Sequence, residues 1–328
     1  MSEAAATIGA SFPTGEGSVS VAVVQSEVFE LAYQAWDAQD YASAGPLLIQ
    51  AARAAEAGGE DEQAHRLWFD AALAAKFLRD WPRAFELGRT AASTAERGAR
   101  DPAFWNLGIA ATVLHDWEVA RDAWLGYGIK LTSTTGEVRE DFGMTPIRLD
   151  PNGRAEVVWA QRICPTRAIV RSVPMHADRH FGDVILHDGA PNGQRIVGEA
   201  KYSVFDEIHV WQPSDIPTWT VVVDTDEPGA ADLVETFAER DLGAEPASSM
   251  KPICACCSTG DVEQQQAAAH AAHGRLFYLA APEEAMFSLL RAWKSRDESG
   301  RAFRDVALIV DEGEEDDADD AGDGVGER

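Results

Sequence analysis

The sequence lacks any apolar run that approaches the roughly 20 residues needed by a membrane-spanning helix. Its start, Met1 to Gly17, also lacks the basic residues and apolar stretch of a secretory signal peptide, so we expect the protein in the cytoplasm. The GxxxxGK[ST], GxGxxG and GxSxG patterns are absent as well. The sequence therefore predicts neither a nucleotide-binding fold nor a serine hydrolase.

Basic residues are scarce: 28 Lys and Arg stand against 55 Asp and Glu, giving a formal net charge of −27. Such a surface repels phosphate backbones and anionic lipids, so we expect no nucleic-acid partner and no membrane partner. A protein or peptide partner is favoured, and basic ones fit best. The charge could equally serve only to keep the protein soluble. The composition of residues 311–328, which include ten Asp or Glu, predicts a disordered acidic tail.

A pattern repeated three times organises the first part of the chain, and it is centred on an aspartate followed by an aromatic residue. These pairs are Asp40-Tyr41, Asp80-Trp81 and Asp116-Trp117. The other matched positions are the alanines Ala44, Ala84 and Ala120, the small residues Ala32, Ala72 and Gly108, and the aromatics Phe29, Phe69 and Trp105. Antiparallel helices approach closely where both contribute small side chains. The pattern therefore predicts three helical hairpins between about Ser26 and Leu125, with the aspartates at the turns.

This pattern resembles the tetratricopeptide repeat (TPR) family over residues 26–130. The matching residues are Leu31, Ala32, Ala44, Leu48 and Ala51 in the first unit, Trp68, Ala71, Ala72, Ala84 and Ala91 in the second, and Phe104, Leu107, Gly108, Ala120 and Trp124 in the third. The resemblance implies a helical array with a groove that binds a peptide or protein. Candidate partner-binding residues are Tyr33, Gln34, Lys76, Arg79 and Trp105.

The rest of the sequence predicts strands as well as helices, so we expect an α+β protein with several domains. Residues 1–25 are expected to be a flexible arm. Residues 140–212 alternate apolar and polar side chains, which indicates an antiparallel β-rich domain in which residues 150–153 and 188–193 form turns. Residues 213–310 are typical of two β-α-β units, with a strand expected at residues 250–254, and such an order suits a ferredoxin-like α+β domain.

Cysteine and histidine cluster in one place with a spacing that suits a metal ion. Cys254 and Cys257 form a CxxC pair, and His270 and His273 follow it. Two thiolates and two imidazoles suit a tetrahedral, structural zinc site. A zinc- or redox-responsive regulator is an alternative interpretation of the same cluster.

A second set of histidines and carboxylates lies in the β-rich region. Its members are His176, His180, His187, His209, Asp178, Asp183 and Asp188. Two histidines and one carboxylate, for example His176, His180 and Asp183, could hold a catalytic metal, which would make the protein a metal-dependent enzyme. Ordinary turn and surface residues explain the same sequence. We expect foremost a protein-interaction scaffold with a structural zinc site, and no catalytic residue is assigned.

Overall fold

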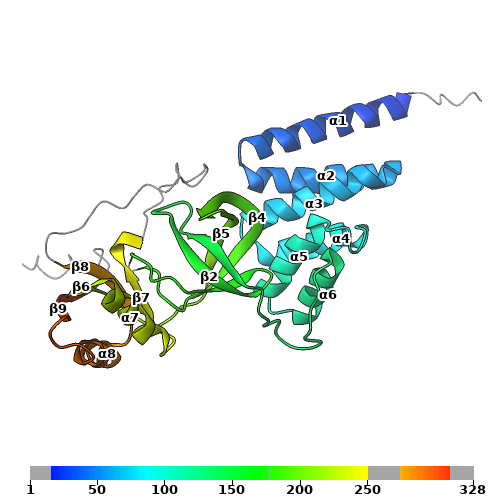
Figure 1. Ribbon diagram of the computed structural model, residues 1–328. Coiled ribbons are helices and arrows are strands. Elements are labelled where there is room, and N and C mark those ends of the chain that lie inside the picture. Colours follow the sequence, from blue (N-terminus) through cyan, green and yellow to red (C-terminus); the bar gives the residue numbers. More distant parts are fainter. Residues whose placement is uncertain (1–15, 177, 250–273, 311–328) are drawn as a thin grey trace, which may run out of the picture. The chain divides into compact units, whose positions relative to one another are not determined.

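The computed structural model describes residues 16–176, 178–249 and 274–310 (Figure 1). The chain divides into two compact units, Met1–Val138 and Arg139–Arg328. In the described residues the first unit is built from helices, and the second contains two β-sheets and two α-helices. The α+β class predicted from the sequence is therefore confirmed. No described helix has both the length and the apolar composition that crossing a membrane requires.

In the first unit each helix packs against the next one along the chain. The helices are α1 (Glu16–Asp37), α2 (Tyr41–Gly58), α3 (Asp61–Phe77), α4 (Trp81–Ser93), α5 (Pro102–Val113) and α6 (Trp117–Tyr127). The predicted start near Ser26 was wrong, because α1 begins at Glu16. Residues 18–25 contain no proline or glycine, so nothing in the backbone stops the helix there.

Three turns of this unit share one geometry, and they coincide with the repeated aspartates. The residue before each aspartate lies in the left-handed region: φ is 59° at Gln39, 56° at Arg79 and 59° at His115. Each aspartate then caps the next helix, accepting a hydrogen bond from the backbone N–H of Ser43, Arg83 or Val119. The backbone N–H of each aspartate closes the preceding helix by donating to the carbonyl of Ala35, Ala75 or Ala111. The repeated pattern thus ends one helix and starts the next.

The small residues of the repeat lie where neighbouring helices meet. Ala44, Ala84 and Ala120 are all buried. At Gly108 in α5, a Cβ atom would lie only 2.6 Å from Cζ2 of Trp124 in α6. Trp124 is itself fully buried. Because Gly108 has no side chain, the indole ring of Trp124 in α6 can pack directly against the backbone of α5.

In the second unit, five strands form a closed barrel in sequence order. The strands are β1 (Met144–Leu149), β2 (Glu156–Cys164), β3 (Arg167–Val170), β4 (Val184–Val197) and β5 (Ala200–Gln212). Consecutive strands are antiparallel, whereas β1 and β5 pair in parallel. In a meander of five strands the first and the fifth run in the same direction, so the closing pair is parallel.

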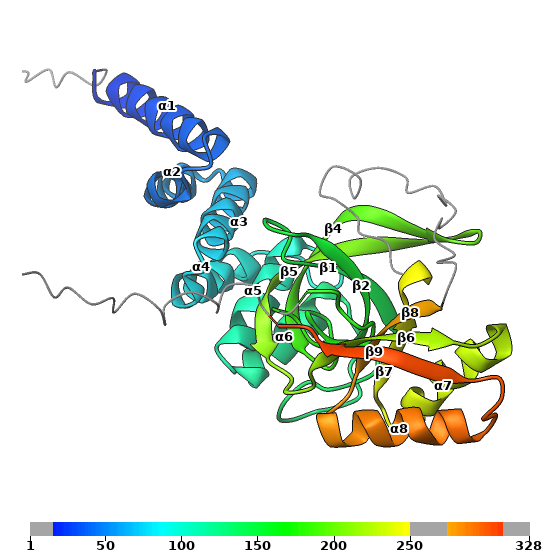
Figure 2. The ribbon, with the colours of Figure 1, turned by 90° about the vertical axis from the view of Figure 1, so that its left-hand side faces the viewer.

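The strands β4 and β5 form a long hairpin (Figure 2). Residues 150–153 form the predicted turn between β1 and β2. The turn predicted at residues 188–193 was wrong, because β4 continues through them with register shifts on both sides of Pro191. Asp188 Oδ1 accepts hydrogen bonds from the N–H groups of Gly189 and Ala190. Residues that favour turns here produce a local bulge within a strand instead.

The second sheet has the strand order β7-β8-β6-β9, and every neighbouring pair is antiparallel. Its elements are β6 (Thr218–Asp224), α7 (Glu227–Ala238), β7 (Gly243–Pro246), the 3-10 turn η1 (Ala247–Ser249), β8 (Arg275–Ala280), α8 (Glu283–Ser295) and β9 (Ala302–Leu308). The two helices share one apolar core with the strands, and Trp293 Nε1 of α8 donates to the Gly229 carbonyl of α7 at 2.8 Å. The strand predicted at residues 250–254 lies outside the described residues.

Candidate functional site

Side-chain contacts connect the odd-numbered helices of the first unit to one another. The Tyr33 hydroxyl of α1 donates a hydrogen bond of 2.6 Å to Asp70 Oδ2 of α3. Lys76 Nζ of α3 donates one of 3.0 Å to Asn106 Oδ1 of α5. We call the surface around these contacts the odd-helix face, and it is defined by Phe29, Tyr33, Asp70, Lys76, Trp105 and Asn106. The two acceptors are equivalent positions in the repeat, since Asp70 and Asn106 each follow the repeated aromatic residue. The donors are not equivalent, because Tyr33 lies four residues after Phe29 and Lys76 lies seven residues after Phe69.

Asp70 is the half-buried carboxylate of the odd-helix face. Burial raises the pKa of its carboxyl group, although the hydrogen bond from Tyr33 and the charge of Arg66 act in the opposite direction. The pKa of Tyr33 is raised too, first by burial and then by the hydrogen bond to Asp70. The pair therefore holds a partly desolvated carboxylate beside a phenol that stays protonated.

Tyr33, which donates to this carboxylate, is one of two aromatic residues of α1 that pack together. The rings of Phe29 and Tyr33 have centroids 4.8 Å apart and planes tilted by 54°. The Phe29 side chain remains 37% exposed, so its ring is accessible from solvent. Further along, the ring of Trp36 lies 6.0 Å from that of Phe77, which is 45% exposed. The odd-helix face thus combines accessible aromatic surface with a carboxylate.

The predicted partner-binding residues occupy different environments. Tyr33 lies on the odd-helix face, and its neighbour Gln34 is exposed. Lys76 is 8% exposed and bonded to Asn106, so its ammonium group is committed within the fold. Trp105 packs its ring against Trp124 at 5.3 Å. Arg79 lies in the turn between α3 and α4.

Sequence reasoning missed Asp70 and Asn106. A usable signal was present, because the residue after the repeated aromatic is polar in all three copies: Glu30, Asp70 and Asn106. It also missed His65, whose ring contacts Asp101 Oδ2 and Thr94 Oγ1 at 3.0 Å each. Asp101 is the N-cap of α5, so His65 connects α3 to the start of that helix. This contact is a structural element of the array.

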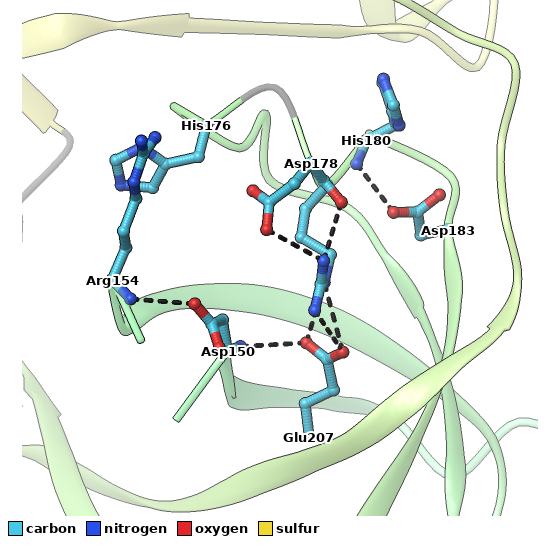
Figure 3. A network of polar contacts seen from close by, with 8 residues as sticks. Asp150, Arg154, His176, Asp178, His180, Asp183 and Glu207 are labelled. Carbon is cyan, nitrogen blue, oxygen red and sulfur yellow. Dashed lines mark hydrogen bonds and ion pairs between the residues drawn. The ribbon is translucent and has the colours of Figure 1, made fainter. Parts of the chain in front are cut away.

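The second candidate region is a network of charged side chains at the barrel (Figure 3). Glu207 is buried and accepts hydrogen bonds from Nε and Nη2 of Arg179, at 3.1 and 2.8 Å, and from the backbone N–H of Asp150 at 3.1 Å. Arg179 also forms an ion pair with Asp178. These contacts attach the loop that contains Arg179 to β5, which is a structural role.

Three of the proposed metal ligands have other partners: Asp183, His176 and His187. Asp183 accepts hydrogen bonds of 2.7 Å from the backbone N–H groups of His180 and Ser214, one on each oxygen. His176 Nδ1 lies 3.4 Å from Arg154 (Figure 3). His187 is fully buried, and burial together with the charge of Arg162 lowers its pKa to about 3. In residues 16–176, 178–249 and 274–310, no three His, Cys, Asp or Glu side chains are grouped so that they could hold a metal ion.

The remaining members of this set have packing roles in the barrel. The ring of His209 stacks on that of Trp211, and Asp188 forms the bulge of β4. Glu156, at the start of β2, is a different case. Burial and the nearby charges of Glu245 and Asp178 raise its pKa to about 7, although its carboxylate accepts a hydrogen bond from the Met175 N–H. The carboxyl group of Glu156 can therefore exchange a proton near neutral pH.

The predicted zinc ligands Cys254, Cys257, His270 and His273 lie outside the described residues. The chain matches no protein-family model, no curated protein and no solved structure. The fold and the odd-helix face are thus the basis for a functional assignment.

Proposed function

We propose that the protein is an interaction scaffold in which a TPR-like array, residues 26–130, binds a peptide or protein partner on its odd-helix face. The single observation that carries the proposal is the pair of contacts Tyr33–Asp70 and Lys76–Asn106, whose acceptors are equivalent positions in the repeat. They connect α1 to α3 and α3 to α5 through polar side chains, and the partner would bind the surface around them. A surface of this kind can recognise a peptide by shape and by a few polar contacts.

The repeated turns support the proposal, because they give each hairpin the same geometry. A residue in the left-handed backbone conformation precedes each capping aspartate, at Asp40, Asp80 and Asp116. Repeat proteins build an extended surface from such successive, similar hairpins. The acidic charge of the chain favours a basic partner.

For the second unit we propose a supporting role. The strand order β7-β8-β6-β9 with antiparallel neighbours is the order of a ferredoxin-like α+β domain, and we assign residues 213–310 to that class. We further propose a structural zinc ion bound by Cys254, Cys257, His270 and His273, on the basis of their spacing. Metal analysis of the purified protein and of Cys257→Ser tests this: about one zinc per chain, reduced in the variant, is expected, and a metal-free protein would refute it.

The binding proposal is tested by affinity capture from lysate with the full chain and two matched variants. Phe29→Glu places a charge on the odd-helix face, and Leu125→Glu places one on α6, where Leu125 is 46% exposed. Loss of the captured partner with Phe29→Glu and its retention with Leu125→Glu is the expected result. Equal retention by both variants would show that the odd-helix face does not bind the partner.

A further inference from the structure

Asp70 and Asn106 are equivalent positions in the repeat, but only one of them has a cation from the preceding odd-numbered helix. Asn106 accepts its hydrogen bond from the ammonium group of Lys76 in α3. Asp70 accepts from the neutral hydroxyl of Tyr33 in α1, a helix that contains no Lys or Arg. The charged acceptor, Asp70, therefore receives no cationic donor from the preceding odd-numbered helix, whereas the neutral acceptor, Asn106, does.

The hydrogen bond from Tyr33 uses one of the two carboxylate oxygens of Asp70. Its second oxygen, Oδ1, makes no hydrogen bond with any side chain or backbone group among the described residues. The nearby Arg66, one helical turn earlier on α3, is 70% exposed and pairs with Glu62 at 3.5 Å. Because the carboxylate is partly buried, an ion pair there is screened less than one on an open surface.

The aromatic border is the second feature that suits a cation. Tyr33 is hydrogen-bonded to Asp70, its ring packs against that of Phe29, and Phe29 is accessible. A lysine ammonium or an arginine guanidinium is attracted by the face of an aromatic ring, and the attraction adds to that of a carboxylate. A ring pair with an adjacent carboxylate thus favours a cationic side chain over an apolar or anionic one.

Charge is also distributed unevenly between the two sets of helices. The sequences of α1, α3 and α5 contain seven Asp or Glu and two Lys or Arg, whereas α2, α4 and α6 contain four of each kind. The excess of negative charge is therefore on the helices that form the odd-helix face. It would attract a basic chain and repel an acidic one.

We propose that Asp70, together with the rings of Phe29 and Tyr33, binds a lysine or arginine side chain of a basic peptide segment in the partner. This inference rests on the proposed function, because it specifies the chemistry of the partner that the odd-helix face binds. The cation binds Oδ1 of Asp70, the oxygen that is not bonded to Tyr33, and the aliphatic part of its side chain contacts the Phe29 ring.

The test is selection of peptides from a random display library on the immobilised full chain. Three further arms use Asp70→Asn, Phe29→Glu and, as a matched control on α4, Glu86→Gln. Asparagine retains an acceptor for the Tyr33 hydroxyl, and an unchanged circular dichroism spectrum shows that the variant is folded. We expect the selected peptides to share a Lys or Arg and to bind Asp70→Asn at least about tenfold more weakly. They should bind Glu86→Gln with unchanged affinity.

Salt provides an independent readout. Raising NaCl from 50 to 500 mM should weaken binding of the selected peptides to the native chain more than to Asp70→Asn, since the variant lacks the charge that salt screens. Peptides without Lys or Arg, or equal affinity for Asp70→Asn, would overturn the assignment of Asp70 while leaving the proposed function intact. If no peptide is enriched, or if the enriched ones bind Phe29→Glu as well as the native chain, the proposed function and this inference both fail.

Discussion

Replacing Gly108 by alanine tests the packing between α5 and α6, and Gly88→Ala is its matched control. Both glycines are buried within helices of the repeat unit. The added methyl group meets different surroundings at the two sites. At Gly88 it would lie 3.4 Å from Cα and 3.5 Å from Cβ of Leu107, which are ordinary van der Waals distances. At Gly108 it would overlap the indole ring of Trp124.

The expected magnitudes follow from these distances. Alanine is favoured over glycine in a helix interior by about 0.5–1 kcal/mol, and at position 88 this gain should be kept. At position 108 the overlap with a buried ring adds a cost of about 1–3 kcal/mol for overpacking. Gly108→Ala should therefore lower the free energy of unfolding by about 0.5–2 kcal/mol, while Gly88→Ala raises it.

Thermal and urea unfolding of the full chain, followed by circular dichroism at 222 nm, measures both changes. A loss of about 1 kcal/mol lowers the melting temperature of a domain of this size by about 3–6 °C. Adding Trp124→Phe to Gly108→Ala should recover part of the loss, because the smaller ring leaves space for the methyl group. A Gly108→Ala protein as stable as Gly88→Ala would refute the packing described for these helices.

Three further substitutions test other features by the same unfolding assay. Asp116→Ala removes the hydrogen bond from the Val119 N–H at the start of α6 and should cost about 1 kcal/mol; no loss would contradict the capping role. Gln39→Gly should gain about 0.5 kcal/mol, because glycine adopts the left-handed conformation without strain, and a loss would count against the turn geometry. Burial holds the pKa of Glu156 at about 7, above its usual 4.5, so the unfolded chain releases this proton first and stability falls as the pH rises from 4.5 to 7. Glu156→Gln keeps an acceptor for the Met175 N–H. The free energy of unfolding of this variant should exceed that of the native chain by about 2 kcal/mol at pH 8 and should equal it at pH 4. A gain that does not depend on pH would exclude the carboxyl group as the cause.

The sequence predicted local features of the first unit well, because each depends on a few residues at fixed spacing. Ala44, Ala84 and Ala120 are buried, and Asp40 and Asp80 cap helices at the predicted turns. Small side chains and capping aspartates act through their immediate neighbours, so their roles can be inferred from spacing. The side-chain contacts of Asp70 could not be inferred so directly, since its partner Tyr33 lies 37 residues away in the chain.

In the second unit, local preference was a poorer guide. Residues 188–193 are rich in turn-forming types, but pairing with β5 makes them part of a bulged strand. The strand β7, Gly243–Pro246, contains residues that disfavour strands and forms through its pairing with β8. In both cases tertiary pairing outweighs the intrinsic preference of the residues. The histidines that cluster in the sequence form no group of metal ligands among the described residues: Asp183 accepts two backbone hydrogen bonds, and Nδ1 of His187 contacts the Asp188 carbonyl.

Photo-crosslinking tests the central claim, that a partner binds the odd-helix face, most directly. Benzoylphenylalanine would replace Phe29 on that face in one protein and Leu125 on α6 in another, and each full chain would be irradiated in lysate. We expect a discrete covalent adduct from position 29 and none from position 125. An adduct from position 125 alone, or none from either position, would contradict the claim.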